Sequence, residues 1–324
     1  MSATRSFDVV VVGGGSAGCV VARRLVDAGR TVAIVEAGPA GTDAAIRHPE
    51  RCFELPLGRY DWCDVTAPQP HLGGRAVEFA RGKVLGGSSS INNMIYARGS
   101  RVDFDGWKAE GNPGWGYEDL LPLFRRLEDY DGDVSEARGV GGPITVTSRY
   151  ERHPVMADLI DACGRAGVAH NPDYNAGSLE GASFMQFNIR DRRRLSAADA
   201  FLGAVLDEPK LTVLTECTAR RLLFEAGRCV GVEVSRGANI ERLNAETEVV
   251  LCAGAFGSPA LLLRSGVGPA NDLRALGIEL EAGLPGVGAN LHDHVLVPLS
   301  AHAARPFPPQ WQTHAPRYAG AHIR

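Results

Sequence analysis

The sequence predicts an α/β fold with a Rossmann-like domain, because an apolar strand, a glycine-rich turn and a helix follow one another at the start of the chain. The strand covers residues 9–12, and the turn runs from Gly13 to Gly18. A second apolar strand, residues 31–35, ends beside the acid Glu36. This order, with the spacing Gly-x-Gly-x-x-Gly in the turn, predicts a βαβ dinucleotide-binding unit.

The residue types in the turn suit contact with a pyrophosphate. Gly13 permits a tight turn, Gly15 lets the backbone approach phosphates because it has no Cβ, and Gly18 lets the helix pack closely on the strand. The helix N-terminus offers unpaired N–H groups and the positive end of its dipole. We expect Glu36 to accept hydrogen bonds from both ribose hydroxyls and to repel a 2′-phosphate, which disfavours NADP. The motif alone does not separate FAD from NAD.

The rest of the chain predicts further helices and strands. Residues 117–127 have apolar side chains at helical spacing, and residues 196–206 begin with Ser196 as a helix cap and Asp199 in the first turn. The other expected helices are residues 153–167 and 258–265, and the expected strands are residues 211–215, 220–224, 229–235 and 246–252. We expect residues 39–77 to form an irregular cover segment and residues 171–181 to form a loop.

Composition excludes several classes of protein. The chain has 324 residues, 44% hydrophobic and 22% charged, and a net charge of −4 with acids and bases interspersed, so nucleic-acid binding is not expected. No apolar run approaches the ~20 residues that a transmembrane helix needs. The chain enters its first strand almost at once, so we expect no signal peptide. The seven cysteines are odd in number and form no C-x-x-C pair, which predicts reduced thiols and a cytoplasmic location.

A second glycine-rich block covers residues 82–93. Its paired glycines, Gly86 and Gly87, allow a positive φ and close approach of the backbone. Three serine hydroxyls, Ser88 among them, and the amides of Asn92 and Asn93 offer hydrogen bonds without net charge. Such a loop suits the pyrophosphate, ribityl chain and ring edge of a flavin. The alternative is an ordinary serine- and glycine-rich surface loop.

This block resembles the first signature of the glucose–methanol–choline (GMC) family of FAD-dependent oxidoreductases. Residues 254–268, which read GAFGSPALLLRSGVG, resemble the second signature of that family. Further similar stretches are residues 60–62, 103–107, 111–115, 188–190, 196–200 and 285–294, so the resemblance extends from about residue 8 to about residue 299. Within the family, the chain is most similar to choline dehydrogenase and related bacterial alcohol dehydrogenases.

The resemblance implies a Rossmann-like FAD-binding domain with a partial, interrupted substrate-binding (α+β) domain. Residues 1–150 would hold the βαβ unit, the glycine-rich loop and the cover segments. Residues 151–205 would be a partial segment of the substrate domain, and residues 206–300 would return to the FAD-binding domain. Residues 301–324 are expected to form an irregular tail.

The resemblance also implies contacts between FAD and individual residues. Ser16 and Ala17 would meet the pyrophosphate, and Glu36 the adenosine ribose. The flavin side would be lined by Ser88, Asn92 and Asn93, with Ile95 close by. The remaining implied contacts are the backbone near Ala219 with adenine, Gly254 and Ala255 at the second crossover, and Asn290, Asp293 and His294 near the pyrophosphate or flavin. Some relatives bind FAD covalently through a histidine in the first signature. Ile91 stands at that place here, so we expect non-covalent FAD.

The activity that the resemblance implies is hydride transfer from a small alcohol to flavin N5, with electrons passed to an acceptor such as a quinone. The family's catalytic histidine belongs to a later segment, and this chain stops at Arg324. We therefore expect a truncated chain and assign no catalytic residue. His292 and His294 are candidates for a base or for a metal pair, but a structural role or a contact with the flavin is the favoured interpretation, and no metal is expected.

Two alternatives remain open. In the first, the chain binds FAD without turning over an alcohol, which the absence of the catalytic segment favours. The other alternative is an NAD-dependent dehydrogenase of plain doubly wound type. Glu36 permits an NAD-dependent dehydrogenase, but this alternative assigns no role to the block at residues 86–93.

Overall fold

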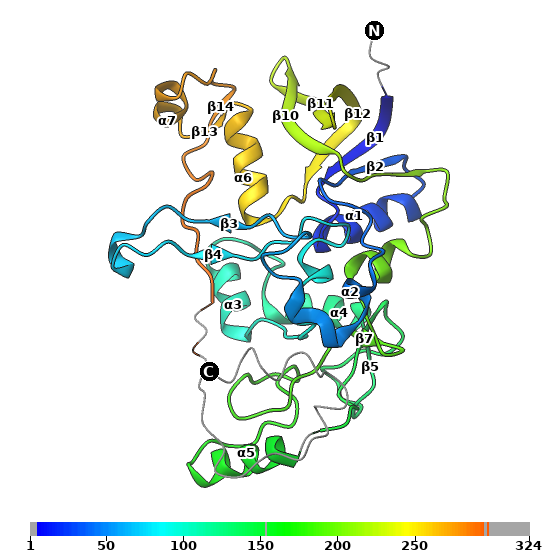
Figure 1. The fold of residues 1–324 in the computed structure, drawn as a ribbon, viewed down its shortest axis with the longest axis vertical. Coiled ribbons are helices and arrows are strands. Elements are labelled where there is room, and N and C mark those ends of the chain that lie inside the picture. The colour runs from blue at the N-terminus through cyan, green and yellow to red at the C-terminus, as the bar shows by residue number, and fades with distance from the viewer. Residues whose placement is uncertain (1–4, 153, 295–296, 298–324) are drawn as a thin grey trace. The chain divides into compact units, whose positions relative to one another are not determined.

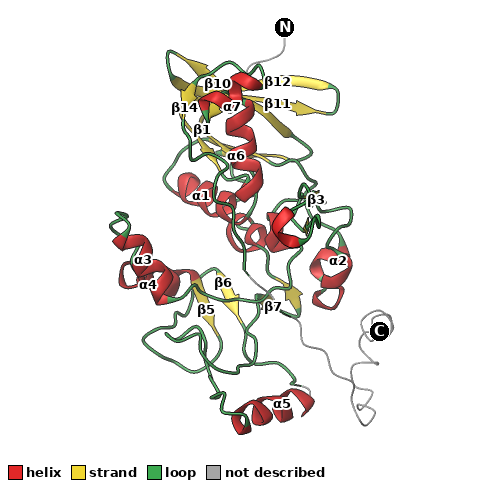
Figure 2. Cartoon of the chain, turned by 90° about the vertical axis from the view of Figure 1, so that its left-hand side faces the viewer, coloured by secondary structure: helices red, strands yellow, loops and turns green. Residues whose placement is uncertain are grey.

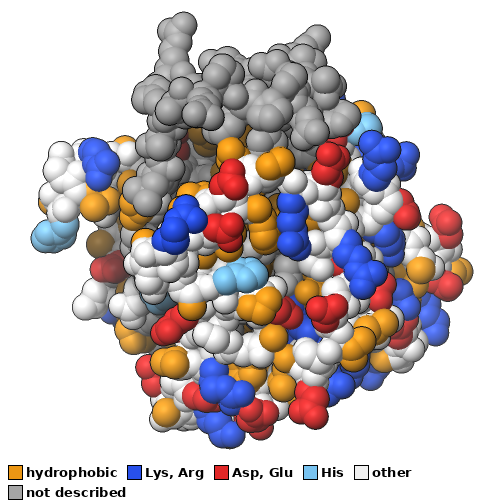
Figure 3. Space-filling model, turned by 90° about the horizontal axis from the view of Figure 1, so that it is seen from below, with side chains coloured by type: hydrophobic (Ala, Val, Ile, Leu, Met, Phe, Trp, Pro, Cys, Tyr) orange, Lys and Arg blue, Asp and Glu red, His pale blue; other side chains and the backbone are white. Residues whose placement is uncertain are grey.

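The computed structural model describes residues 5–152, 154–294 and 297. The chain divides into two compact units, Met1–Gly254 and Ala255–Arg324. The expected irregular tail, residues 301–324, lies outside the described residues. Figure 3 shows one face of the molecule, on which acidic and basic side chains are interspersed.

A six-stranded sheet at one end of the first unit organises the fold (Figures 1 and 2). Its strand order is β10-β11-β12-β1-β2-β9, in which β12, β1, β2 and β9 run parallel and β10, β11 and β12 form an antiparallel meander. The strands are β1 (Arg5–Val12), β2 (Val32–Val35), β9 (Leu211–Leu214), β10 (Thr218–Glu225), β11 (Arg228–Arg236) and β12 (Asn239–Leu251). The helix α1 (Ser16–Asp27) connects β1 to β2 and completes the predicted βαβ unit.

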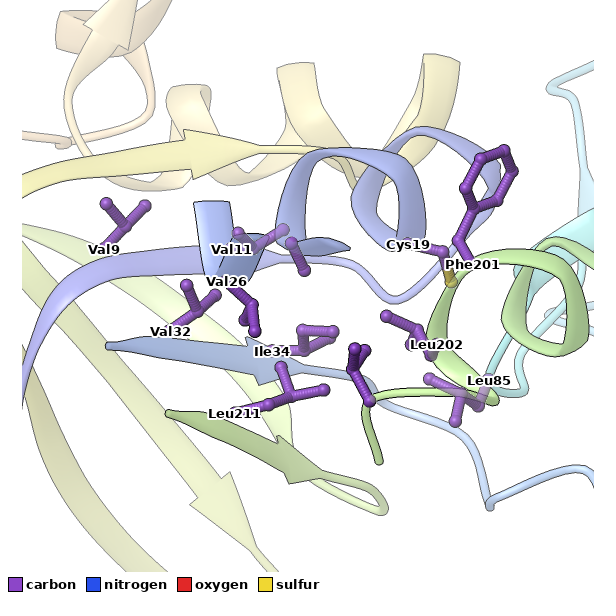
Figure 4. Packing of buried hydrophobic residues seen from close by; sticks show 12 residues of the cluster. Val9, Val11, Cys19, Val26, Val32, Ile34, Leu85, Phe201, Leu202 and Leu211 are labelled. Atoms are coloured by element: carbon purple, nitrogen blue, oxygen red, sulfur yellow. The ribbon is translucent and has the colours of Figure 1, made fainter. Parts of the chain in front are cut away.

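The main core lies between α1, the strands β1, β2 and β9, and the π-helical turn η4 (Ala198–Leu202), as Figure 4 shows. Residues 9–12 of β1 and all of β2 are apolar and buried, as expected where both faces of a parallel sheet are covered. The side chains of Val11, Ile34, Cys19 and Leu202 have no exposed surface. The continuous apolar runs in β1 and β2 therefore indicate strands that are buried on both faces of the sheet.

Replacing Ile34 by valine is expected to lower the free energy of unfolding by about 0.5–1.5 kcal/mol, because one buried methylene is lost and a small cavity remains. The matched control is Ile240→Val on β12, where the isoleucine is 50% exposed and little change is expected. Urea denaturation of the two variants measures the difference. Equal losses for both variants would contradict the assigned core.

Short elements make up the rest of the first unit. The helices are α2 (Ala44–Arg47), α3 (Arg101–Ala109), α4 (Tyr117–Leu127) and α5 (Pro154–Arg165), with 3-10 turns η1 (Pro49–Glu54), η2 (Pro70–Leu72) and η3 (Gly87–Ser90). The paired strands are β3 (Asp64–Val65) with β4 (Glu78–Phe79), β5 (Glu128–Tyr130) with β6 (Ile144–Val146), and β7 (Ile189–Arg190) with β8 (Arg193–Arg194). The helix α5 lies at the end of the unit opposite the six-stranded sheet (Figures 1 and 2).

The second unit is small. It holds most of α6 (Gly254–Arg264), the helix α7 (Ala270–Ala275) and a two-stranded parallel pair, β13 (Val267–Gly268) with β14 (Ala282–Gly283). Leu261 of α6 and Leu273 of α7 are almost fully buried. Across the described part of both units, no helix has the length and apolar character that a membrane-spanning helix requires.

Most predicted elements are confirmed with bounds that differ by a few residues, and three of the differences are described here. The helix expected over residues 117–127 is α4 with the same bounds. The helix expected over residues 196–206 is only the turn η4, in which Gly203 N–H donates to the carbonyl of Ala198. The helix α6 begins at Gly254 rather than at residue 258, and β12 begins at Asn239 rather than at residue 246.

Candidate dinucleotide-binding site

Three glycine-rich segments that are distant in sequence meet at the ends of β1 and β12. The N–H of Gly86 donates to the carbonyl of Gly14 at 2.7 Å, which joins the first glycine turn to the second. The N–H of Cys252 donates to the carbonyl of Val12 at 2.7 Å, which brings the end of β12 to the same place. Backbone hydrogen bonds therefore hold residues 12–14, 86 and 252 together.

Two glycines of the first turn are required by packing. Gly13 has a φ of +101°, and a Cβ at this residue would lie 2.8 Å from Ala253 Cα and closer still to the carbonyl of Cys252. A Cβ at Gly18 would collide with the carbonyl oxygen of Gly13. The first turn of α1 therefore packs directly against the glycine turn, which only glycine at both places allows.

The N-terminus of α1 is open to an anion. Gly15 is the N-cap and provides no side-chain cap, the first turn holds no acid, and Ser16 and Ala17 are exposed. A Cβ at Gly15 would stand 3.8 Å from Gly87 Cα, so it would fill the space between the two glycine-rich segments without a clash. The structure thus keeps a cradle of backbone N–H groups that a pyrophosphate fits.

Glu36 is buried at the end of β2, with 5% of its surface exposed. Its Oε2 accepts from Gly14 N–H at 3.0 Å, and its Oε1 accepts from Gly38 N–H at 2.8 Å. Burial raises the pKa of this carboxyl to about 7, although hydrogen bonds from Gly38 and Gly14 and the nearby Lys83 oppose the shift. Glu36 therefore carries a proton part of the time at neutral pH.

We expect the affinity for FAD to rise about ten-fold between pH 6 and pH 8, because ribose hydroxyls donate to an ionised Glu36 and the pKa of the free chain is near 7. The same raised pKa makes the folded chain lose stability as pH rises from about 4.5 to about 7. Fluorescence titration with FAD at several pH values measures the affinity. Glu36→Gln should remove the pH dependence, and equal wild-type affinities at pH 6 and pH 8 would refute the role of Glu36.

The segment that follows β9 passes beside Glu36. The N–H of Cys217 donates to the carbonyl of Glu36 at 2.9 Å, and the N–H of Glu216 donates to the carbonyl of Gly38 at 2.8 Å. Ala219 lies two residues further on, in β10, and is partly exposed. Gly38 was not among the predicted site residues. A Cβ at this residue would collide with the carbonyl of Lys83, so only glycine fits here.

The serine hydroxyls of the second block fold the block itself. Ser88 Oγ accepts from Gly82 N–H at 3.1 Å, and Ser90 Oγ donates to the carbonyl of Leu85 at 2.8 Å. Ser89 Oγ donates to the carbonyl of Gly86 at 2.5 Å. The hydroxyls of Ser89 and Ser90 therefore donate within the turn and stabilise η3. Ser88 Oγ is an acceptor in its bond to Gly82, so the expected contact of Ser88 with a flavin stays a prediction. Asn92, Asn93 and Ile95 are exposed beyond this turn.

The remaining predicted residues lie at the start of α6 and in the second unit. Gly254 has a φ of +82° and follows Ala253, which packs on Gly13. Ala255, Asn290, Asp293 and His294 belong to the second unit and are exposed, so their contacts with a cofactor stay predictions. Within the described residues, no three His, Cys, Asp or Glu side chains gather as they would around a metal ion.

Comparison with known proteins assigns a family to this geometry. The family model for GMC oxidoreductases matches residues 7–296. The chain is 41% identical over 290 residues to the oxygen-dependent choline dehydrogenase of Rhizobium rhizogenes, covering 89% of this chain and 53% of that protein. The protein of the same name from Brucella ovis is 40% identical over 301 residues, covering 92% of this chain and 55% of its own length. The chain thus spans about half the length of the curated relatives it matches.

Solved structures agree with this match. Pyridoxine 4-oxidase from Mesorbium loti superimposes with a TM-score of 0.82 at 38% sequence identity, covering 86% of this chain and 55% of that one. A formate oxidase from Aspergillus oryzae, solved in a study of FAD modification, gives a TM-score of 0.80 at 31% identity, covering 87% of this chain and 51% of that one.

Proposed function

The chain belongs to the GMC oxidoreductase family, and from this premise we propose that it binds FAD non-covalently and forms the cofactor-binding part of an oxidoreductase acting on the CH–OH group of a small alcohol. The observation that carries the proposal is the hydrogen bond of 2.7 Å between Gly86 N–H and the Gly14 carbonyl. It joins both glycine-rich segments into one cradle, and a plain NAD-binding unit has no need for the second of them.

In this proposal the chain's own residues bind and orient FAD. The N–H groups at Gly15, Ser16 and Ala17 hold the pyrophosphate, and Glu36 accepts hydrogen bonds from the ribose. The segment from Ser88 to Ile95 lies against the flavin side. The other proposed contacts are Ala219 with adenine, and Gly254, Ala255, Asn290, Asp293 and His294 near the pyrophosphate or flavin.

Bound FAD supplies a hydride acceptor, and an external acceptor such as a quinone would then take the electrons. We propose non-covalent binding because the residue at the expected point of attachment is Ile91, a buried residue whose aliphatic side chain has no nucleophilic atom for a covalent bond. We also propose a cytoplasmic location, since all seven cysteines are unpaired thiols.

A second candidate function is FAD binding without turnover. The five histidines that the structure describes, at positions 48, 71, 170, 292 and 294, are all exposed, so none of them lies in a water-excluded site typical of a general base. We therefore assign a catalytic role to none of these five residues.

The test is a spectrum of the purified chain after incubation with FAD and removal of free cofactor. We expect flavin absorbance between about 350 and 500 nm, and release of all flavin into the supernatant after acid precipitation. A chain that retains NAD but no flavin would refute the proposal. Flavin that stays with the precipitate would refute non-covalent binding, and a dye-linked assay with choline and other small alcohols separates the two candidate functions.

A further inference from the structure

Three arginines of the first unit have side chains that are almost fully buried: Arg98, Arg138 and Arg194 are 5%, 4% and 4% exposed. Arg98 and Arg138 pair with Glu128 at 2.6 and 2.9 Å, and Arg138 also pairs with Asp173. Within the described part of the chain, no carboxylate forms an ion pair with Arg194. Since buried cations are normally paired, Arg194 is the exception among the three.

Arg194 donates only to neutral oxygens, and most of them belong to the second glycine-rich block. Its Nη1 donates to the carbonyl of Asn92 at 2.7 Å, to Oδ1 of Asn92 at 2.9 Å and to the carbonyl of Ser89 at 3.2 Å. Its Nε donates to the carbonyl of Ile46 at 2.9 Å. Its Nη2 is buried and has no hydrogen-bond partner among the described residues.

The positive charge of Arg194 persists despite this environment. Burial lowers the pKa of the guanidinium to about 10, an effect that Cys52 and Asp199 oppose only in part. The group is therefore protonated at neutral pH. A buried cation without a counter-ion destabilises a fold, and such groups are found where they act on a bound ligand.

Asn92 connects Arg194 to the residues that follow it in the turn. The same Oδ1 that faces Arg194 also accepts from Met94 N–H at 3.0 Å. Met94 is buried and has a φ of +59°, a left-handed conformation that costs energy for a side chain of this kind. Asn188 N–H holds the carbonyl of Met94 at 2.7 Å from the other side. Arg194 and Asn92 thus keep the backbone in a strained shape just before the exposed residue Ile95.

We propose that Arg194 is a positioning residue that holds residues 89–94 in their flavin-binding conformation, and that its unneutralised charge raises the reduction potential of FAD bound beside this turn. The inference rests on the proposed function. The reduced flavin carries more negative charge than the oxidised form, and a nearby buried cation stabilises it preferentially because the protein interior screens charge weakly.

Two substitutions separate the geometric effect from the effect of charge. Arg194→Lys keeps the charge, but its single nitrogen cannot replace the planar group that donates to Ile46 from Nε and to Asn92 from Nη1 at the same time. Arg194→Met removes both the charge and the hydrogen bonds. The matched control is Arg193→Lys at the neighbouring residue, which is exposed. Three measurements are made on each protein: the dissociation constant for FAD, the flavin reduction potential by equilibration with a redox dye, and amide hydrogen exchange at residues 89–94 without FAD.

We expect Arg194→Lys to weaken FAD binding about ten-fold and to speed amide exchange at residues 89–94, with a reduction potential close to that of the wild type. Arg194→Met should show both effects and a lower potential, and Arg193→Lys should match the wild type. Unchanged affinity and exchange in Arg194→Lys would overturn the positioning role, and equal potentials in Arg194→Met and Arg194→Lys would overturn the role of charge. Failure of the wild-type chain to bind FAD would refute the proposed function and with it the claim on the potential, whereas the exchange measurement would still test the positioning role.

Discussion

Replacing Glu128 by glutamine is expected to lower the free energy of unfolding by about 3–5 kcal/mol, because it leaves two buried guanidinium groups with one carboxylate fewer. Glu128 has no exposed surface, and both of its oxygens accept hydrogen bonds from Arg138, at 2.9 and 3.2 Å. Arg98 Nη2 lies 2.6 Å from Oε1, and Gly139 N–H donates to the same oxygen at 2.7 Å. A neutral amide at this position would turn one acceptor into a donor that faces other donors.

The loss of stability should exceed that of the ion pairs alone, because Arg98 and Arg138 connect several segments of the chain. Arg138 Nη1 also donates to Gln186 Oε1 at 2.9 Å, and Gln186 accepts at the same atom from Asn175. Asn175 in turn accepts from Arg98 N–H at 2.7 Å. The backbone of residues 96–98, which follows the proposed flavin loop, is therefore held by the same buried network as Glu128.

The matched control is Glu118→Gln in α4. Glu118 pairs with Arg101 at 2.6 Å, a distance equal to that of the Arg98–Glu128 pair, but its side chain is 68% exposed and that of Arg101 is 47% exposed. Solvent screens such a pair, so a loss of at most about 1 kcal/mol is expected. Chemical denaturation of both variants measures the contrast, and a loss at Glu128 no larger than that at Glu118 would show that the buried network adds nothing to stability.

The contrast between these two acids shows what the sequence can predict and what it cannot. The βαβ unit was predictable because its strand, turn, helix and terminal acid are contiguous, and periodicity reports which faces are buried. The network around Glu128 was not, because Arg98 and Asn175 are 77 positions apart and no local pattern distinguishes their side chains from exposed ones. Arg194 was missed for a related reason: it follows two exposed arginines of the same hairpin, and only its packing against Asn92 sets it apart.

The capping residues of a helix could be predicted from the sequence, but the length and type of the helix that follows the cap could not. Ser196 and Asp199 bond reciprocally, as the expected helix start requires, with Ser196 Oγ donating to Asp199 Oδ2 at 2.6 Å. The helix nevertheless ends after a single wide turn, whose Phe201 and Leu202 lie in the core. The helix α3 carries the same kind of signal, Ser100 as N-cap with Asp103 in the first turn, and was not predicted from it.

Replacing Gly87 by alanine is expected to weaken FAD binding by about 100-fold or more, because the two glycine-rich segments can no longer approach each other. Gly87 is buried, has a φ of +56°, and a Cβ there would lie 2.7 Å from Gly15 Cα. Backbone must move to relieve this contact, and the nearest connection between the segments is the hydrogen bond from Gly86 N–H to the Gly14 carbonyl. The cradle at the N-terminus of α1 would therefore open.

Gly237→Ala is the matched control for this substitution. Gly237 has a φ of +58°, almost that of Gly87, but no atom lies within 4 Å of its Cβ position. Both variants bear the cost of a left-handed alanine, about 1 kcal/mol, and only Gly87→Ala adds a steric clash worth about 1–3 kcal/mol more. FAD titration and thermal unfolding of the two variants measure both effects. If Gly87→Ala binds FAD as tightly as Gly237→Ala, the close approach of the two glycine-rich segments is not what forms the cofactor site.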